Sequence, residues 1–213
     1  MTSWTEHLEN PVLIKELRSR MRGAKPYWIM LGYIGILVLI FWISYGSWRT
    51  NTEATASNMG KFGETLFASL TITQLILCFM LAPALTSGAI TIEREQRTFD
   101  LLLITLLRPG EIFVGKLLSA LSYLALLLVS SLPLMALSFL FGGVSPMDLA
   151  ISFLVILCSG LFFGIVGLGA SCMFPRTAAA TAVAYGATLL IAGATVFADV
   201  ILPKFYFLNF LKK

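Results

Sequence analysis

The sequence predicts an all-α fold, a polytopic integral membrane bundle of five spanning helices in a single domain, residues 1–213. Hydrophobic residues make up 58% of the chain and charged residues 12%, with a mean hydropathy of +0.88. Soluble domains are about half apolar and a quarter charged, so we infer that lipid surrounds this chain. Five stretches without Asp, Glu, Lys or Arg reach the roughly 20 residues that cross a membrane as helix, and they are too continuous for barrel strands. We predict spans at residues 27–48, 66–90, 112–141, 149–173 and 177–198.

Residues 1–25 are predicted to form an amphipathic helix at the membrane surface. Asn10 and Pro11 resemble an N-cap and the first position of a helix. Leu13, Leu17 and Met21 then recur every four residues, with basic residues on a different face. This helix either only anchors the chain or also contacts a partner.

The distribution of basic residues predicts a cytoplasmic N-terminus. Loops that are rich in Lys and Arg stay on the cytoplasmic side. The segments before the first span, between the second and third, and between the fourth and fifth would share that side, although the lysines of the tail fit less well. The basic residues of these segments are Lys15, Arg18, Arg20, Arg22, Lys25, Arg94, Arg97, Arg108, Lys116 and Arg176.

Aromatic residues mark both ends of the first span: Tyr27 and Trp28 at one end, Tyr45 and Trp48 at the other. The following loop, residues 49–64, is polar. In the second span, Pro83 predicts a kink in the cytoplasmic half.

The third and fourth spans are separated by residues 142–146, with the sequence GGVSP, which predicts a tight turn on the outer side. Asp148 and Asp199 lie at the outer ends of spans, where we expect them to cap helices or face water. Residues 199–213 are predicted to form an interfacial tail, because Pro203 and Lys204 interrupt the apolar run.

Small residues spaced four apart predict close helix packing in the last two spans. Gly160 and Gly164 form a G-x-x-x-G pattern, and Ala178, Ala182 and Gly186 repeat the spacing. We expect these residues to pack within the bundle, with a contact between subunits as the alternative. The three cysteines, at positions 78, 158 and 172, are expected to be small buried packing residues.

No catalytic or metal-binding arrangement is evident, and we predict that the chain is not an enzyme. Residues 110–116 match G-x-x-x-x-G-K, but Leu117 stands where a phosphate-binding loop needs Ser or Thr, and no strand precedes it. We interpret Gly110 as part of a turn and Lys116 as a side chain that reaches the membrane surface. The only histidine, His7, lies in the polar N-terminal segment. Ionisable groups are missing from the middle of the spans, which disfavours an ion-coupled carrier.

Residues 93–116 form a polar island between two apolar spans. The island begins EREQRTFD and continues into a leucine-rich block that Arg108, Pro109 and Gly110 interrupt. We predict a helix, a turn and a second helix at the membrane surface, accessible to another protein.

Two stretches resemble the membrane-spanning subunit of type-2 ATP-binding-cassette (ABC) transporters, the export-type permeases: NPVLIKELRSRMRG at Asn10–Gly23 and SGAITIEREQRTFDLLLITLLRPGEIFVGKLL at Ser87–Leu118. The resemblance covers residues 10–198 and implies that residues 93–111 form a cytoplasmic coupling helix that receives motion from a separate ATPase. It also implies a dimer with a second permease copy or homologue in the bacterial inner membrane, with ATP and magnesium bound by the ATPase and no cofactor in this chain. The family has six spans where this chain has five. The resemblance implies that one set of residues contacts or braces against the ATPase and the amphipathic N-terminal helix: Glu93, Arg94, Glu95, Arg97 and Thr98. Arg108 is a further expected contact with the ATPase.

The sequence is compatible with three functions. The first is the permease subunit of an ATP-driven exporter, which forms the translocation path. The second is a structural or assembly protein of the membrane that transports nothing, and the third, disfavoured, is a secondary carrier. Nucleic acid is not an expected partner, and the sequence favours no substrate.

Overall fold

The computed structural model describes residues 24–51, 56–96 and 109–211, with side chains up to residue 194. The predicted amphipathic helix at residues 1–25 therefore lies almost wholly outside the described residues. The described chain is helical throughout apart from short turns. Its elements are α2 (Lys25–Asn51), α3 (Ala56–Ser87), α4 (Thr91–Glu95), α6 (Pro109–Phe141), α7 (Pro146–Met173) and α8 (Thr177–Leu211).

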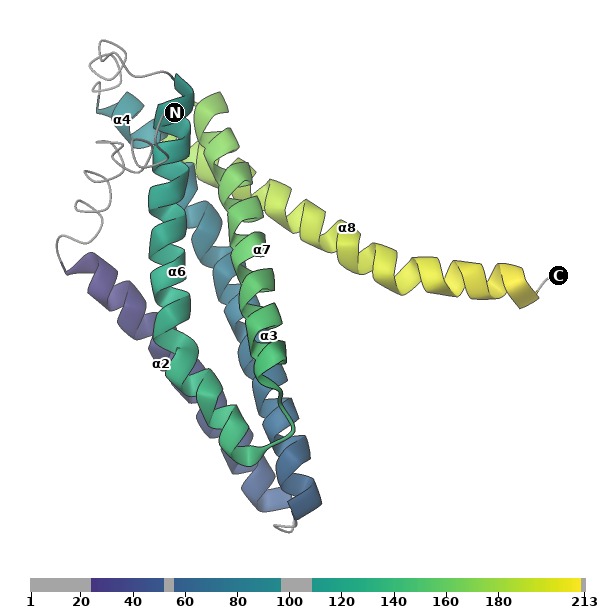
Figure 1. The fold of residues 1–213 in the computed structure, drawn as a ribbon. Helices are drawn as coiled ribbons and strands as arrows, with labels where there is room; N and C mark the ends of the chain where they lie inside the picture. The colour runs from purple at the N-terminus through teal and green to yellow at the C-terminus, as the bar shows by residue number, and fades with distance from the viewer. Residues whose placement is uncertain (1–23, 52–55, 97–108, 212–213) are drawn as a thin grey trace, which may run out of the picture.

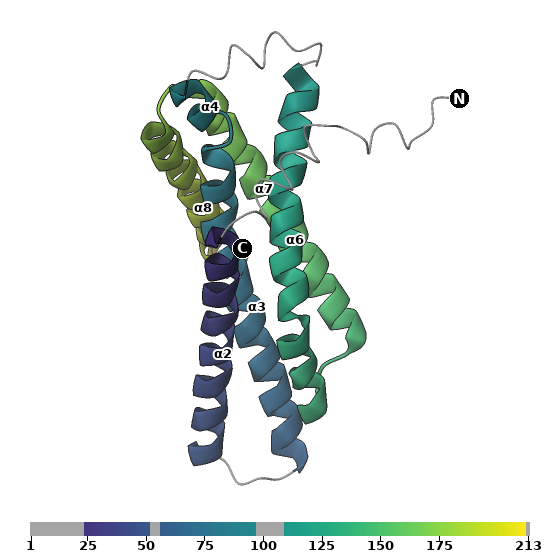
Figure 2. The same ribbon diagram turned by 90° about the vertical axis from the view of Figure 1, so that its left-hand side faces the viewer.

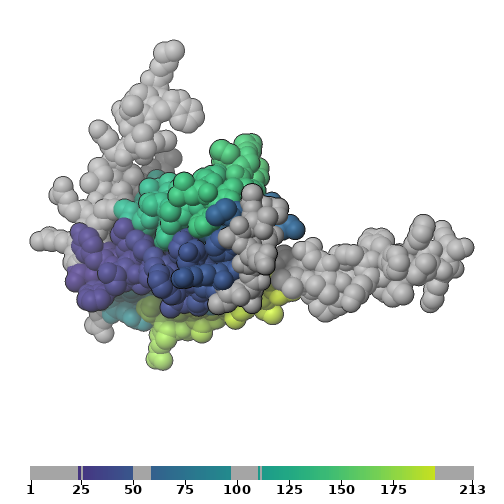
Figure 3. Space-filling view, turned by 90° about the horizontal axis from the view of Figure 1, so that it is seen from below, coloured from purple at the N-terminus to yellow at the C-terminus, as the bar shows by residue number. Residues whose placement is uncertain are grey.

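Five of these helices are long and apolar enough to cross a membrane, which confirms the predicted all-α membrane bundle. Helices α3, α6 and α7 run side by side, and α8 leaves this group and projects away from it (Figure 1). The short α4 lies at the end of the bundle beside α7 and α8 (Figure 2). Seen from the opposite end, α2 and α3 lie between α6 and α8 (Figure 3).

The apolar core lies where α2, α3 and α6 meet. Tyr33 and Leu37 from α2 pack against Leu66 and Leu70 from α3 and Leu127 from α6, and all are buried. The outward faces of the same helices are apolar and exposed, as expected where lipid replaces water.

The end of the bundle opposite α4 is held by aromatic rings and glycines. The ring of Phe62 lies 4.9 Å from that of Trp48 and 4.8 Å from that of Phe141, measured between centroids. The predicted turn between the third and fourth spans is confirmed, with Gly142 at φ 84° and Gly143 at φ 82°, where other residues would be strained. This turn lies directly on α3, because a Cβ added at Gly63 would collide with the carbonyl oxygen of Gly142.

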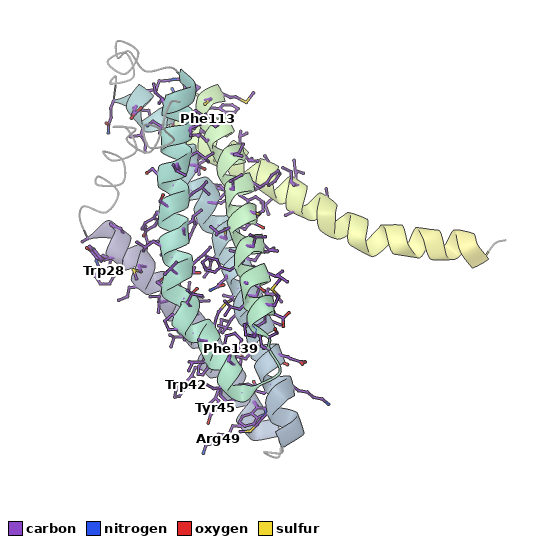
Figure 4. All side chains as sticks on the ribbon, viewed as in Figure 1. Trp28, Trp42, Tyr45, Arg49, Phe113 and Phe139 are labelled. Carbon is purple, nitrogen blue, oxygen red and sulfur yellow. The ribbon has the colours of Figure 1, made fainter. Side chains whose placement is uncertain are left out.

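The predicted aromatic belts differ at the two ends of α2. Tyr27 and Trp28 are 69% and 70% exposed, as expected at an interface with lipid headgroups. At the other end, Tyr45 and Trp48 instead pack into the cluster around Phe62. Figure 4 labels Trp28 and Tyr45 at the two ends of α2.

Several helices extend beyond the predicted spans. The second spanning helix begins at Ala56 rather than residue 66, because its polar first turns continue the same helix, and residues 49–51 belong to α2. Helix α8 continues through Pro203 to Leu211, so the predicted break and separate tail are absent. A proline removes one backbone donor and crowds the preceding turn, which a helix of 35 residues accommodates here.

The small residues of α7 and α8 differ in their packing. Gly160 and Gly164 are buried, and a Cβ on Gly160 would lie 3.0 Å from the sulfur of Cys78 on α3. On α8, however, Ala178 and Ala182 are exposed, and a Cβ on Gly186 would meet no atom within 4 Å.

The packing face of α8 is shifted by two residues from the predicted one. It consists of Ala180, Ala184 and Thr188, all fully buried. The predicted packing of Ala178, Ala182 and Gly186 within the bundle is therefore wrong, because a helix rotates by ~200° over two residues. Their alternative role, a contact between subunits, stays a prediction.

The cysteines are only partly as expected. Cys78 is buried between α3 and α7, whereas Cys158 and Cys172 are exposed on α7. The prediction of burial is wrong for these two, because α7 turns one side away from the other helices.

Candidate functional site

The predicted coupling segment begins at a bend that we call the elbow, residues Ser87–Gln96. Helix α3 ends at Ser87, one turn after Pro83, and α4 starts at Thr91. Two backbone hydrogen bonds stabilise the bend. The N–H of Ala89 donates to the carbonyl oxygen of Thr86 (3.0 Å), and the N–H of Ile92 donates to that of Gly88 (3.1 Å). The kink at Pro83 itself stays a prediction, and the structure shows that the helix ends one turn later. The elbow contacts three further spanning helices.

Its contact with α6 is an ion pair. The Nζ atom of Lys116 lies 2.7 Å from Oε1 of Glu93 and donates to the carbonyl oxygen of Ala89 at 2.6 Å. Lys116 is 2% exposed and Glu93 is 24% exposed. The expectation that Lys116 reaches the membrane surface is therefore wrong: a carbonyl and a carboxylate next to it satisfy the ammonium group inside the protein.

Its contact with α7 is made by Ser171. The Oγ atom of this buried serine accepts hydrogen bonds from the backbone N–H groups of Ile90 (3.0 Å) and Thr91 (3.1 Å). The first N–H groups of a helix have no partner within it, and Ile90 supplies no side-chain cap. A side chain from another helix therefore caps α4. Arg94 adds a long bond of 3.5 Å to the carbonyl oxygen of Phe174.

Its contact with α8 is made by Glu95 and Ser87. Oε1 of Glu95 accepts from the backbone N–H of Thr177 at 2.7 Å, at the start of α8, where a negative charge is favourable. The hydroxyl groups of Ser87 and Thr181 lie 3.0 Å apart. One turn before Pro83, Tyr185 of α8 also donates to the carbonyl oxygen of Met80 at 2.6 Å.

The residues predicted to contact a partner therefore divide into two groups. Glu93, Arg94 and Glu95 each bond to another part of this chain, to α6, to the end of α7 and to α8 respectively. Arg97, Thr98 and Arg108 lie outside the described residues.

Two residues that bind the elbow, Ser171 and Lys116, could not be recognised as its partners from the sequence. Ser171 sits in a run of small and apolar residues with no local pattern that indicates a cap. Lys116 follows an apolar segment and ends the phosphate-loop pattern, and neither feature indicates a buried ion pair with Glu93. Residues 110–116 form the first turns of α6, whereas a phosphate-binding loop precedes its helix.

The elbow is held against α6, α7 and α8 by hydrogen bonds and by the ion pair between Glu93 and Lys116. Among the residues that the structure describes, no group of three His, Cys, Asp or Glu side chains could hold a metal ion. Polar contacts with defined partners fix α4 relative to the spanning helices. The chain matches no protein-family model and no curated protein sequence.

Proposed function

We propose that the chain is the membrane-spanning permease subunit of an ATP-driven ABC exporter of the type-2 class. In this proposal a separate cytoplasmic ATPase binds ATP and magnesium and drives the subunit through the segment that follows the elbow. The proposal draws on the resemblance of residues 87–118 to such permeases and on five apolar helices that suit a translocation path.

The observation that supports it most is how the elbow is connected. It continues directly from α3 and bonds to α6 through Lys116, to α7 through Ser171 and to α8 through Thr177. A force on residues 97–108 would therefore reach four spanning helices through short polar contacts. Coupling between distant sites needs such a physically connected element.

The bonds of the elbow also suggest which residues contact the ATPase and which brace the coupling segment against the spanning helices. Because Glu93 and Glu95 bond inward, we assign bracing to them and assign the ATPase contact to Arg97, Thr98 and Arg108. The subunit would work with a second copy or homologue in the bacterial inner membrane, with its N-terminus in the cytoplasm. The outward stripe at Ala178, Ala182 and Gly186 is a candidate contact between the two subunits.

Cross-linking tests the proposal. A photoreactive amino acid at position 97, in the native membrane, is expected to form an adduct with a protein that carries nucleotide-binding motifs. The same group at position 147, at the other end of the bundle where Met147 is 65% exposed, should form none. No ATPase adduct from position 97, or equal adducts from both positions, would contradict the proposal and favour the structural or assembly function.

Charge reversal offers an independent measurement. Arg97→Glu with Arg108→Glu should reduce the ATPase retained in mild detergent about tenfold, which corresponds to ~1.4 kcal/mol. Lys61→Glu, an exposed change at the opposite end, should leave it unchanged. Glu93 is unsuitable for this test, because its reversal would break the ion pair with Lys116.

A further inference from the structure

A small cavity with two polar residues in its wall lies inside the bundle, away from the elbow. Its walls come from α2, α3, α6 and α7, and its volume is about 10 Å³, counted as room for the centre of a water molecule. A single buried water needs ~10–15 Å³ on this count. Most of the lining is leucine and isoleucine, and the polar groups come from Tyr33 and Gln74.

The hydrogen bonds around Gln74 define what the cavity requires. The hydroxyl of Ser131 donates its only hydrogen to the carbonyl oxygen of Leu128 at 2.7 Å, so towards Gln74 it can only accept. The amide nitrogen of Gln74 must therefore face Ser131, and it donates to that oxygen. The amide oxygen, Oε1, is consequently turned away from Ser131.

This oxygen is buried and has no donor among the described residues. Gln74 is 1% exposed, and its Oε1 has no hydrogen-bond partner. The hydroxyl of Tyr33, which is 4% exposed, lies beside Gln74 and Ser131 but also has no partner in hydrogen-bond geometry. Buried polar groups in proteins are almost always paired, directly or through water, and lipid offers no substitute.

We propose that this cavity is a binding site for one ordered water molecule. The water donates one hydrogen to Oε1 of Gln74 and accepts a hydrogen from the hydroxyl of Tyr33. This satisfies both protein groups and provides the two partners that a buried water requires at least. The water thereby connects α2 with α3.

Radiolytic labelling tests the site on the intact chain in lipid nanodiscs. Brief X-ray exposure splits water into hydroxyl radicals, which oxidise side chains that touch a bound water even when bulk solvent does not reach them. Tyr123 is the matched control: it is 5% exposed, packs in the same core cluster and bonds to the carbonyl oxygen of Pro26, but it does not line the cavity. We expect Tyr33 to be oxidised at least several-fold faster than Tyr123.

The variant Gln74→Met keeps the side chain's length but removes Oε1. In it, oxidation of Tyr33 should fall to the rate of Tyr123. Equal rates for the two tyrosines in the unmodified chain would overturn the proposal, and this comparison does not depend on whether the variant folds. An unchanged rate for Tyr33 in a folded Gln74→Met protein would overturn it as well.

Discussion

Lys116 places an ammonium group between α6 and the elbow, where it is almost fully shielded from solvent. Such a group is stable there only because the carbonyl oxygen of Ala89 and the carboxylate of Glu93 lie within 2.7 Å. Removing one partner of a buried pair leaves the other uncompensated, which costs more than the pair contributes. We therefore expect a variant that removes one partner to lose more stability than the intact pair contributes.

Lys116→Met should lower the free energy of unfolding by about 3 kcal/mol, the lower end of the range for broken buried pairs, because Glu93 remains partly exposed. Denaturant titration in mixed micelles measures this. Lys61→Met, at an exposed position, should change stability by less than ~0.5 kcal/mol. Adding Glu93→Gln should restore part of the loss, and a double variant less stable than Lys116→Met alone would contradict the assigned pair.

Gly167 allows α7 to approach α3 closely at Pro83 and Thr86. A Cβ at this position would collide with Oγ1 of Thr86 and lie 3.1 Å from Cα of Pro83, which is backbone and cannot move aside. Gly167→Ala is therefore expected to destabilise the protein by about 1–3 kcal/mol, as overpacking does.

Gly169 on the same helix is the control, because a Cβ there meets nothing within 4 Å. Gly169→Ala should be neutral or stabilise by up to ~1 kcal/mol through helix propensity. Equal losses for the two variants, measured by the same titration, would show that glycine flexibility rather than packing governs this helix.

At the scale of residues, the sequence predicted the role of a polar side chain only where its hydrogen-bond partner lies a few residues away in the chain. Asp148 was expected to cap a helix, and it does so with Ser145, three residues away. Lys116 and Ser171 could not be assigned, because their partners lie 27 and 81 residues away in the chain. Only the packing of α3 against α6 and α7 brings these groups together.

At the scale of elements, α7 has the best-defined start. Oγ of Ser145 accepts from the N–H of Met147 at 3.3 Å, and Asp148 accepts from the N–H of Ser145 at 3.0 Å, which forms a reciprocal capping box. Ser145→Ala should therefore reduce stability by about 1 kcal/mol. Ser159→Ala serves as control, because the exposed Ser159 hydroxyl bonds only to its own helix at Val155. A loss no larger than that of the control would mean that the cap contributes little.

The existence of each spanning helix followed from apolar length, but the face by which α8 packs did not. Small residues occur on several sides of α8, so a spacing of four fits both Ala178–Ala182 and Ala180–Ala184. Which set is buried depends on the rotation of α8 against α3 and α7, set partly by the bonds from Thr177 and Thr181 to the elbow. Local pattern carries no information about that rotation.

At the scale of the whole molecule, the number of spans and their alternation were predictable because lipid imposes both the length and the polarity of each segment. Which helices pack against each other could not be predicted, since apolar residues occur on all sides of every span. The close pairing of α3 with α7, for example, depends on Gly160 and Gly167, whose spacing resembles that of many other glycines in the chain.

Cysteine labelling tests the orientation of the bundle. With the three native cysteines replaced by alanine, Met147→Cys should react with a membrane-impermeant maleimide on intact cells. Thr98→Cys should react only after the membrane is opened, because α6 separates the two positions and the basic loops favour the cytoplasm. The reverse pattern would place the elbow outside the cell and contradict the proposed ATPase contact.

The turn at Gly142 and Gly143 has a consequence for movement. There the backbone of α3 at Gly60 and Gly63 lies directly against the backbone of the α6–α7 connection. At the elbow, by contrast, the helices meet through side-chain bonds that can exchange partners. A rearrangement begun at the elbow would therefore pivot about the glycine turn, so displacements should grow from almost nothing at that face of the membrane to their largest value at the other.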